Sequence, residues 1–306
     1  MPIAELNGCP IFYEVRGSGP PLVFAHGGFG GAGTGLGVAA PPWRDPFAER
    51  LQVITFDRRS AGRSGAPATP HTMALFADDL RALLRHLGIE RAAVMGTSAG
   101  GPIVLEFALR HPDALTCLVV TESAPRFFPD AHQRQRLKDR IALLEREGPE
   151  AAYAARRTQG TVGLQLFSAE RAAADADEEA RRAERRAALQ SQLAGLSREE
   201  RIARYAAELR TYAAYADYDA TPRLREIQAP TLVINATGDT IFPPSFVDWP
   251  ALVRGMPNAR YVALPGGEHG SVSADQGALD TILDFVLAHV PGTRPRHGAA
   301  SVHASS

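Results

Sequence analysis

The stretch that decides the fold is AAVMGTSAGGPIVLEFAL, residues 92–109, in which an apolar run meets a helix-like segment at a serine. Residues 96–100 fit the pattern G-x-S-x-G, with Ser98 at its centre. A sharp turn between a strand and a helix forces such a serine into a strained backbone conformation and lifts its hydroxyl above the sheet edge. Gly96 and Gly100 leave room for this crowded turn. The pattern therefore predicts that Ser98 is a nucleophile.

Apolar runs and helix-like segments alternate on both sides of this turn. The pattern predicts strands at residues 11–15, 22–25, 52–56, 92–95, 115–121, 231–236 and 261–264, and helices at residues 76–87, 103–109 and 279–289. Runs such as residues 115–121 are apolar on both faces, which is typical of parallel strands buried between layers of helices. We therefore expect an α/β protein with a mostly parallel sheet.

The alternation stops over residues 126–221, which are rich in Ala, Arg and Glu. Within them, residues 170–186 carry eleven charged residues out of seventeen, as expected of a solvated helix. We expect the apolar residues Leu164, Leu166 and Phe167 either to face a pocket or the core, or to hold the helices of this insertion together. The predicted organisation is a core in two parts, residues 1–125 and 222–292, a helical insertion at 126–221 and a disordered tail at 293–306.

A serine hydroxyl is a weak nucleophile and needs a base that a third group orients. His269 follows the last predicted strand, and Asp239 follows the predicted strand at residues 231–236. Both residues should therefore lie at the carboxyl edge of the sheet, as Ser98 does. The chain order Ser98, Asp239, His269 is the order expected with this type of turn.

A second carboxylate competes for the role of the orienting acid. Glu122 directly follows the predicted strand at residues 115–121, so the sheet would also allow it to reach the histidine. We favour Asp239 because Gly238 before it permits a tight turn. Glu122 would then bind substrate or anchor the insertion.

The loop after residues 22–25 reads His26-Gly27-Gly28-Phe29-Gly30. A tetrahedral oxyanion needs two backbone N–H donors that converge on it. We expect one donor from Ala99 and the other from Gly28, with Phe29 as the neighbouring candidate. His26 is expected to support the loop by hydrogen bonding. The loop is rich in glycine, but no Gly-Lys-Ser/Thr follows it, so a nucleotide site is not expected.

In combination these motifs resemble the α/β-hydrolase superfamily over residues 8–292. The matching segments are His26-Gly27-Gly28, residues 57–64 (DRRSAGRS), residues 96–100, Gly238-Asp239 with Pro243 four residues on, and Glu268-His269-Gly270. The resemblance implies a sheet of about eight strands, with residues 126–221 as a helical cap over the active site. It also implies that the protein needs no cofactor and that residues 57–64 form a structural turn.

Within this superfamily, the identity of the nucleophile and of its neighbours favours some classes of enzyme over others. Haloalkane dehalogenases and epoxide hydrolases use aspartate where this chain has Ser98. HGG with DxRxxGRS resembles proline iminopeptidases, but Phe29 stands where those enzymes have proline, and Ala99 where they commonly have tryptophan. A small residue after the serine is compatible with esterases, lactonases and carbon–carbon bond hydrolases. We expect an esterase-like or lactonase-like serine hydrolase with a Ser-His-Asp triad and an acyl-enzyme intermediate. The alternatives are a proline-iminopeptidase-like aminopeptidase and a slow-turnover ligand-binding receptor on the same fold.

The composition bears on partners and location. The chain has 33 Lys and Arg against 34 Asp and Glu, so it has no charge excess suited to nucleic acid or an anionic membrane. Cys9 and Cys117 form neither a disulfide framework nor a CxxC pair, and no metal site is expected. The sequence begins without a signal-peptide pattern, and no apolar run reaches the roughly 18 residues of a membrane span. We therefore expect a cytoplasmic protein that binds a small-molecule acyl substrate, and we leave a homodimer open.

Overall fold

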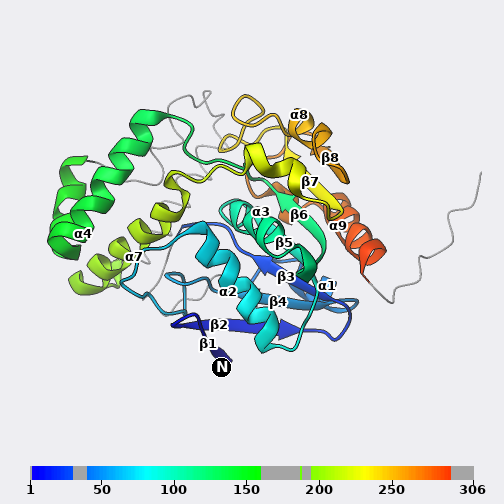
Figure 1. Ribbon diagram of the computed structural model, residues 1–306, viewed down its shortest axis with the longest axis horizontal. Helices are drawn as coiled ribbons and strands as arrows, with labels where there is room; N and C mark the ends of the chain where they lie inside the picture. Colours follow the sequence, from blue (N-terminus) through cyan, green and yellow to red (C-terminus); the bar gives the residue numbers. More distant parts are fainter. Residues whose placement is uncertain (1, 30–39, 160–186, 188–193, 291–306) are drawn as a thin grey trace, which may run out of the picture.

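The computed structural model describes residues 2–29, 40–159, 187 and 194–290 (Figure 1). These residues form a sheet of eight strands in the order β1-β2-β4-β3-β5-β6-β7-β8. The strands are β1 (Ile3–Leu6), β2 (Cys9–Arg16), β3 (Pro21–Ala25), β4 (Gln52–Phe56), β5 (Ala92–Thr97), β6 (Leu115–Thr121), β7 (Thr231–Ala236) and β8 (Ala259–Leu264). The β1–β2 and β2–β4 pairs are antiparallel, and the remaining neighbours are parallel. The predicted mostly parallel sheet is confirmed.

Helices cover both faces of this sheet (Figure 1). One face packs against α2 (Met73–His86), α3 (Gly100–Arg110) and α8 (Trp249–Arg254), and the other against α1 (Arg44–Ala48) and α9 (Gln276–His289). Side chains alternate between the faces of a strand, so each central strand feeds both cores. In β5, for example, Val94 belongs to one core and Met95 to the other. This double burial explains why the central strands are apolar on both faces.

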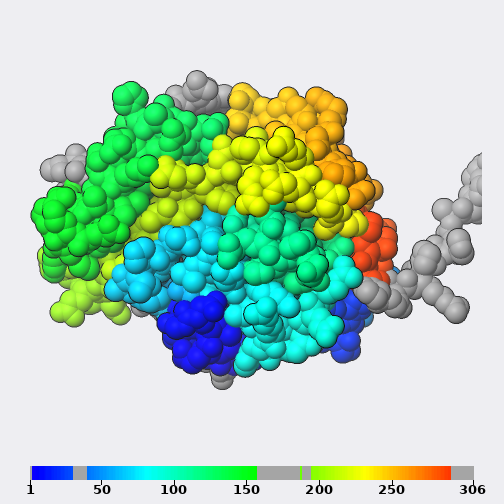
Figure 2. Space-filling view, viewed as in Figure 1, coloured from blue at the N-terminus to red at the C-terminus, as the bar shows by residue number. Residues whose placement is uncertain are grey.

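The insertion between β6 and β7 contains two long helices in the described part of the chain, α4 (Ala131–Gln159) and α7 (Arg198–Ala216). They lie side by side at one end of the molecule, and in the space-filling view α4 projects there beyond the core (Figures 1 and 2). The long helix α4 kinks at Gly148, whose φ is 86°, next to Pro149. Helix α7 begins at a capping box in which Ser197 and Glu200 satisfy each other's backbone N–H groups.

The two ends of the expected insertion meet. Arg126 and Asp219 form an isolated β-bridge and an ion pair of 3.3 Å, and the short 3-10 helix η2 (Thr221–Glu226) leads from there toward β7. Residues 170–186, the apolar group Leu164, Leu166 and Phe167, and the tail at 293–306 lie outside the described residues. Their expected roles, like that of the insertion as a cap, stay predictions.

Within the described ranges, every helix is too short or too polar to cross a lipid bilayer. The same ranges contain no group of three or more His, Cys, Asp and Glu side chains arranged to hold a metal ion.

Candidate active site

Ser98 lies on a strained turn between β5 and α3. Its φ is 49°, a left-handed conformation that is rare for a residue with a side chain. The Ser98 N–H donates to the carbonyl of Thr121 on β6 at 3.0 Å, which fixes the turn to the sheet. A Cβ atom on Gly96 would lie 2.5 Å from the Gly100 carbonyl oxygen, and one on Gly100 would lie 2.0 Å from that of Ala25. Only glycine fits at these two positions, so the turn has the geometry that G-x-S-x-G predicts.

The structure brings Ser98, His269 and Asp239 together at the carboxyl edge of the sheet. His269 follows β8, and its Nε2 atom lies 3.0 Å from Ser98 Oγ. Asp239 follows β7, and its Oδ2 atom lies 2.9 Å from His269 Nδ1. Ser98 and His269 are half-buried, whereas Asp239 is 1% exposed. The three groups form a continuous hydrogen-bonded chain from carboxylate to hydroxyl.

The surroundings of Asp239 keep it ionised. Burial alone would raise the pKa of this carboxyl, but the hydrogen bond and charge of His269 and the backbone donors outweigh it, and the pKa is lowered. Those donors are the N–H groups of Ile241 at 2.8 Å and Phe242 at 3.0 Å, both on Oδ1. An ionised Asp239 holds the proton of His269 on Nδ1, which leaves Nε2 free to accept the proton of Ser98.

Glu122, the competing carboxylate, lies behind the histidine loop. Its Oε1 atom accepts the N–H groups of Gly270 at 2.9 Å and Val272 at 3.1 Å. The side chain is 1% exposed, and burial raises the pKa of its carboxyl. Glu122 therefore fixes the backbone that follows His269, while the imidazole ring itself bonds to Asp239.

The three residues expected to form the oxyanion hole lie around Ser98. Ala99 is buried and stands at the N-terminal end of α3, where helix N–H groups lack intrahelical partners. The loop after β3 approaches from the other side, because a Cβ atom on Gly27 would lie 3.0 Å from Ser98 Cβ. Gly28 is exposed with a φ of 75°, and Phe29 beside it is half-buried. The loop after β3 and the start of α3 therefore flank Ser98.

Two side chains hold the peptide groups whose N–H atoms are candidates for this hole. His26 Nδ1–H donates to the Gly27 carbonyl at 2.6 Å, and Ser123 Oγ donates to the Ser98 carbonyl at 2.6 Å. His26 Nε2 accepts the backbone N–H of Arg58 at 3.3 Å. Burial, followed by the charge of Arg58, lowers the pKa of His26 to about 3, so its ring is neutral. These contacts give His26 the supporting position that the sequence predicts.

Residues 57–64 form the structural turn implied by the resemblance, with one exception. Arg59 pairs with Asp79 at 2.5 and 2.7 Å, and Arg63 pairs with Asp57 at 2.8 Å. Arg58 instead reaches the site, where its Nη2 donates to the Gly28 carbonyl and its Nη1 donates to the Tyr215 hydroxyl at 3.1 Å.

Sequence reasoning missed both members of this contact. Arg58 occupies a variable position of the DxRxxGRS motif, and Tyr215 lies in the last turn of α7 within an insertion that carries no readable motif. The tyrosine hydroxyl in turn donates to the carbonyl of Ala99 at 2.5 Å. These two residues therefore connect both sides of the candidate oxyanion hole.

Aromatic rings from the loop, the insertion and the core meet beside the triad. Phe29 stacks on Tyr212 of α7 with ring centroids 4.3 Å apart, and it also packs edge-on against Phe127. Phe127 contacts Phe242, whose ring lies 5.6 Å from that of His269. An aromatic cluster therefore reaches His269 through Phe242, and helix α7 supplies Tyr212 to it.

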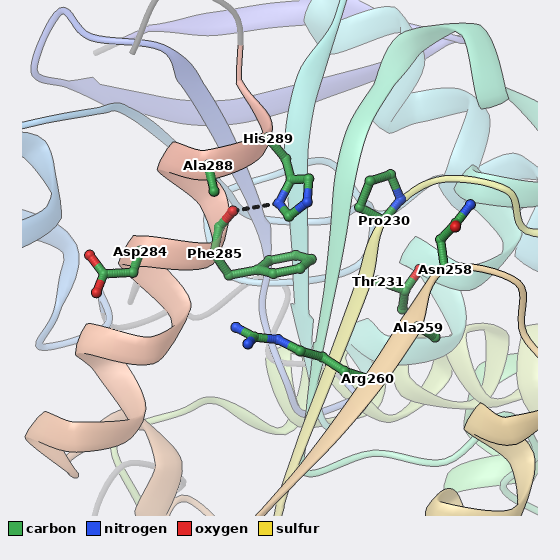
Figure 3. A pocket seen from close by; sticks show the side chains of 9 residues that line it. All are labelled: Pro230, Thr231, Asn258, Ala259, Arg260, Asp284, Phe285, Ala288 and His289. Atoms are coloured by element: carbon green, nitrogen blue, oxygen red, sulfur yellow. Dashed lines mark hydrogen bonds between the residues drawn. The ribbon is translucent and has the colours of Figure 1, made fainter. Parts of the chain in front are cut away.

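A separate cavity of about 560 Å³ lies at the opposite edge of the sheet (Figure 3). It is lined by the beginnings of β7 and β8 and by the end of α9. His289 there bonds to the Phe285 carbonyl of its own helix. Because the triad lies at the carboxyl ends of the strands, this cavity is remote from it.

The chain is similar to known proteins over most of its length. Residues 20–273 match the family described as alpha/beta hydrolase fold. "Putative carbamate hydrolase RutD" of Caulobacter sp. (strain K31) is 31% identical over 282 residues, covering 90% of this chain and 95% of that protein. The protein of the same name from Azorhizobium caulinodans is 30% identical, covering 92% of this chain and 97% of the relative.

Solved structures agree on the fold. An enol-lactonase from Burkholderia xenovorans LB400 superposes with a TM-score of 0.65 at 23% identity, covering 93% of this chain and 99% of that structure. A thermophilic esterase from Thermogutta terrifontis superposes with a TM-score of 0.64 at 22% identity, covering 92% and 95%. With a family match that spans most of the residues and relatives that align almost end to end, the chain belongs to the alpha/beta hydrolase fold family.

Proposed function

We propose that this chain is a serine hydrolase that cleaves a carboxylic ester or a lactone through an acyl-enzyme intermediate. The observation that carries the proposal is the pair of hydrogen bonds that joins Asp239, His269 and Ser98. Neutral serine becomes an effective nucleophile only when an oriented base accepts its proton, and this geometry supplies both the base and the group that orients it.

In the proposed reaction, Ser98 Oγ attacks the substrate carbonyl while His269 Nε2 accepts the hydroxyl proton. The resulting oxyanion accepts N–H hydrogen bonds from Ala99 and Gly28, with Phe29 as the alternative loop donor. When the intermediate collapses, His269 returns its proton to the leaving alcohol oxygen, and Ser98 keeps the acyl group. Water then attacks the acyl-enzyme with the same base, and the acid product leaves.

The family and the relatives support hydrolysis as the class of reaction. Relatives at 30–31% identity carry the name of a carbamate hydrolase, which makes a carbamate the second candidate substrate. The same attack on a carbamate carbonyl would form a carbamoyl-enzyme. An ester or lactone with an apolar acyl group suits the rings around the triad better, because Phe29 is half-buried and can pack against such a group.

The expected helical cap, residues 126–221, is part of this proposal. Tyr212 of α7 already contacts Phe29 beside the site, so the insertion can influence which substrate fits. An aminopeptidase and a slow-turnover receptor would use the same fold. Turnover is therefore measured on a panel of p-nitrophenyl esters, lactones, carbamates and aminoacyl anilides. An aminopeptidase would prefer the anilides, and a receptor would turn over every substrate slowly.

A fluorophosphonate probe tests the nucleophile directly. We expect the probe to label Ser98 stoichiometrically, with the modified peptide identified by mass spectrometry. Ser98→Ala should fold and lose both labelling and turnover by several orders of magnitude. Ser18→Ala, which alters an exposed serine in the turn between β2 and β3, is the control and should react as the wild type does. Labelling at another serine, or turnover near wild type in Ser98→Ala, would contradict the mechanism.

A further inference from the structure

We propose that Arg58 and Tyr215 are positioning residues that fix the two sides of the oxyanion hole and tie it to helix α7. The proposal rests on the function proposed above, because it assigns roles within that same reaction. It is based on hydrogen bonds of Arg58 and Tyr215 that are separate from the bonds joining Asp239, His269 and Ser98.

The first observation is that Arg58 is buried and that none of the described residues supplies a carboxylate to it. Its side chain is 2% exposed, and in the described part of the chain no Asp or Glu forms an ion pair with it. Arg59 is equally buried but bonds to both carboxylate oxygens of Asp79. A buried charge is costly unless it is paired. An arginine buried only for structural reasons would be expected to pair with a carboxylate, as Arg59 does. Arg58 instead donates to a carbonyl and a hydroxyl, which indicates another role.

The second observation is where the donors of Arg58 point. Its Nη2 donates to the Gly28 carbonyl, which belongs to the peptide group that carries the Phe29 N–H. Its backbone N–H donates to His26 Nε2, and His26 passes a hydrogen bond to the Gly27 carbonyl, in the peptide group that carries the Gly28 N–H. Arg58 thus holds both candidate donors of the loop. A hydrogen bond to a carbonyl fixes the plane of its peptide group and strengthens the N–H of that group as a donor.

The third observation is that Tyr215 completes the link on the other side of Ser98. Its hydroxyl accepts from Arg58 Nη1 and donates to the Ala99 carbonyl. The side chain is 1% exposed, so these bonds form away from water. One hydroxyl therefore joins Ala99, the residue after the nucleophile, to the arginine that holds the loop donors. The Ala99 carbonyl is in the peptide group that follows the proposed donor, so Tyr215 fixes the residue that carries this N–H.

These contacts also couple the hole to the insertion. Tyr215 lies in the last turn of α7, and Tyr212 one turn earlier stacks on Phe29. A shift of α7 would therefore change two contacts at once, the hydrogen bond from Tyr215 to Ala99 and the stacking of Tyr212 on Phe29. The guanidinium of Arg58, which no carboxylate in the described part of the chain neutralises, also places positive potential on the Gly28 peptide group that borders the proposed oxyanion hole.

The test compares two buried tyrosines of the same helix. Tyr215→Phe removes one hydroxyl and keeps the ring. Tyr205→Phe is the matched control, because Tyr205 is also buried on α7 and hydrogen-bonds an arginine, Arg140. Its ring packs on Tyr153 of α4, whereas the Tyr215 hydroxyl bonds to Ala99. For each protein, kcat and KM are measured on the best ester of the panel, together with the inhibition constant of a trifluoromethyl ketone and the thermal unfolding midpoint.

We expect Tyr215→Phe to lower kcat about 10- to 100-fold with KM within about threefold of wild type, and to weaken the ketone by a similar factor. The ketone forms a tetrahedral adduct on Ser98, so its inhibition constant reports on the oxyanion hole. A loss of folding stability alone would leave this inhibition constant unchanged. Tyr205→Phe should leave both quantities within about twofold. Equal behaviour of the two variants, or a Tyr215→Phe effect confined to KM, would overturn the proposal.

A second variant covers the case in which Tyr215→Phe does not fold. Arg58→Lys keeps the charge but lacks the fork that reaches Gly28 and Tyr215 together, so it should show the same loss in kcat and in ketone affinity. Wild-type values in Arg58→Lys would overturn the proposal. Failure of the underlying function is recognised separately, because the wild type would then neither react with the phosphonate nor turn over any substrate of the panel.

Discussion

His26 makes a specific prediction about acid stability. Its ring is 6% exposed, its Nδ1–H donates to the Gly27 carbonyl and its Nε2 accepts the Arg58 N–H. A proton on Nε2 would remove that acceptor and place a second charge beside the Arg58 guanidinium. Burial and this neighbouring charge lower the pKa of His26 from 6.5 to about 3. The folded protein therefore keeps His26 neutral at pH values where the unfolded chain protonates it.

The sign and size of the effect follow from proton linkage. Above pH 6.5 both states are neutral at His26, and the residue causes no pH dependence. Below pH 6.5 the unfolded chain binds the proton and the folded protein does not, so the free energy of unfolding falls as the pH falls. At about 1.36 kcal/mol per pKa unit, the loss is about 2 kcal/mol at pH 5 and about 4 kcal/mol at pH 3.

The variant His26→Asn separates this contribution from the rest. Asparagine keeps an N–H donor near the position of Nδ1 but does not titrate. We expect the variant to be less stable than the wild type at pH 7.5, because the Arg58 N–H loses its acceptor. Between pH 7.5 and pH 5, however, its free energy of unfolding should fall by about 2 kcal/mol less than that of the wild type. Urea denaturation followed by circular dichroism at both pH values measures this difference.

Two further histidines define the controls. His71 is buried, burial lowers its pKa to about 4, and it acts in the same direction in both proteins, so its contribution cancels. His132 is exposed on α4, and His132→Gln should keep the pH dependence of the wild type. If His26→Asn and the wild type lose the same free energy between pH 7.5 and pH 5, the reasoning about His26 is refuted.

Substitutions of Asp239, Glu122, Gly100 and Asp79 test the contacts of the site and the core. Asp239→Asn should lower kcat roughly 10²–10⁴-fold, and Glu122→Gln should lower it less than about tenfold, when both are measured on the same substrate. The reverse order would show that Glu122 is the carboxylate that orients His269. Gly100→Ala should give little folded protein, because its Cβ would lie 2.0 Å from a backbone oxygen, and a thermal midpoint equal to wild type would contradict this. Asp79→Asn leaves Arg59 buried without its charge partner and should cost about 3–5 kcal/mol in urea denaturation, whereas a loss below 1 kcal/mol would show that the pair contributes little.

The strands of the core could be predicted because their burial is visible in the local sequence. The predicted bounds of β4, β6 and β7 agree with the structure, and those of the other predicted strands differ by at most two residues at either end. Helices α2, α3 and α9 each begin three residues before the predicted first residue. Apolar periodicity does not report the first helical turn, which in α2 is fixed by the Thr72 cap and in α9 by the Asp275 cap.

Some elements escaped prediction although a local signal existed. Strand β1 pairs with β2 through Asn7 and Gly8, which have φ values of 48° and 72°. Asn-Gly is the preferred pair for a two-residue hairpin turn, so this strand was readable from the sequence. Helices α1 and α8 are only five and six residues long, and a single turn or two carries too little periodicity to be recognised.

The sequence alone determined the strand-to-helix turn at Ser98 and the strand ends that carry Asp239 and His269. Turn geometry and burial depend on neighbours a few residues away, so the sequence pattern contains them. Only the tertiary structure decided that the His269 ring meets Asp239 while Glu122 holds the backbone behind it. Only the tertiary structure joined Arg58 to Tyr215, which are 157 positions apart. Such contacts depend on how loops and the insertion close in space, and no local periodicity records that closure.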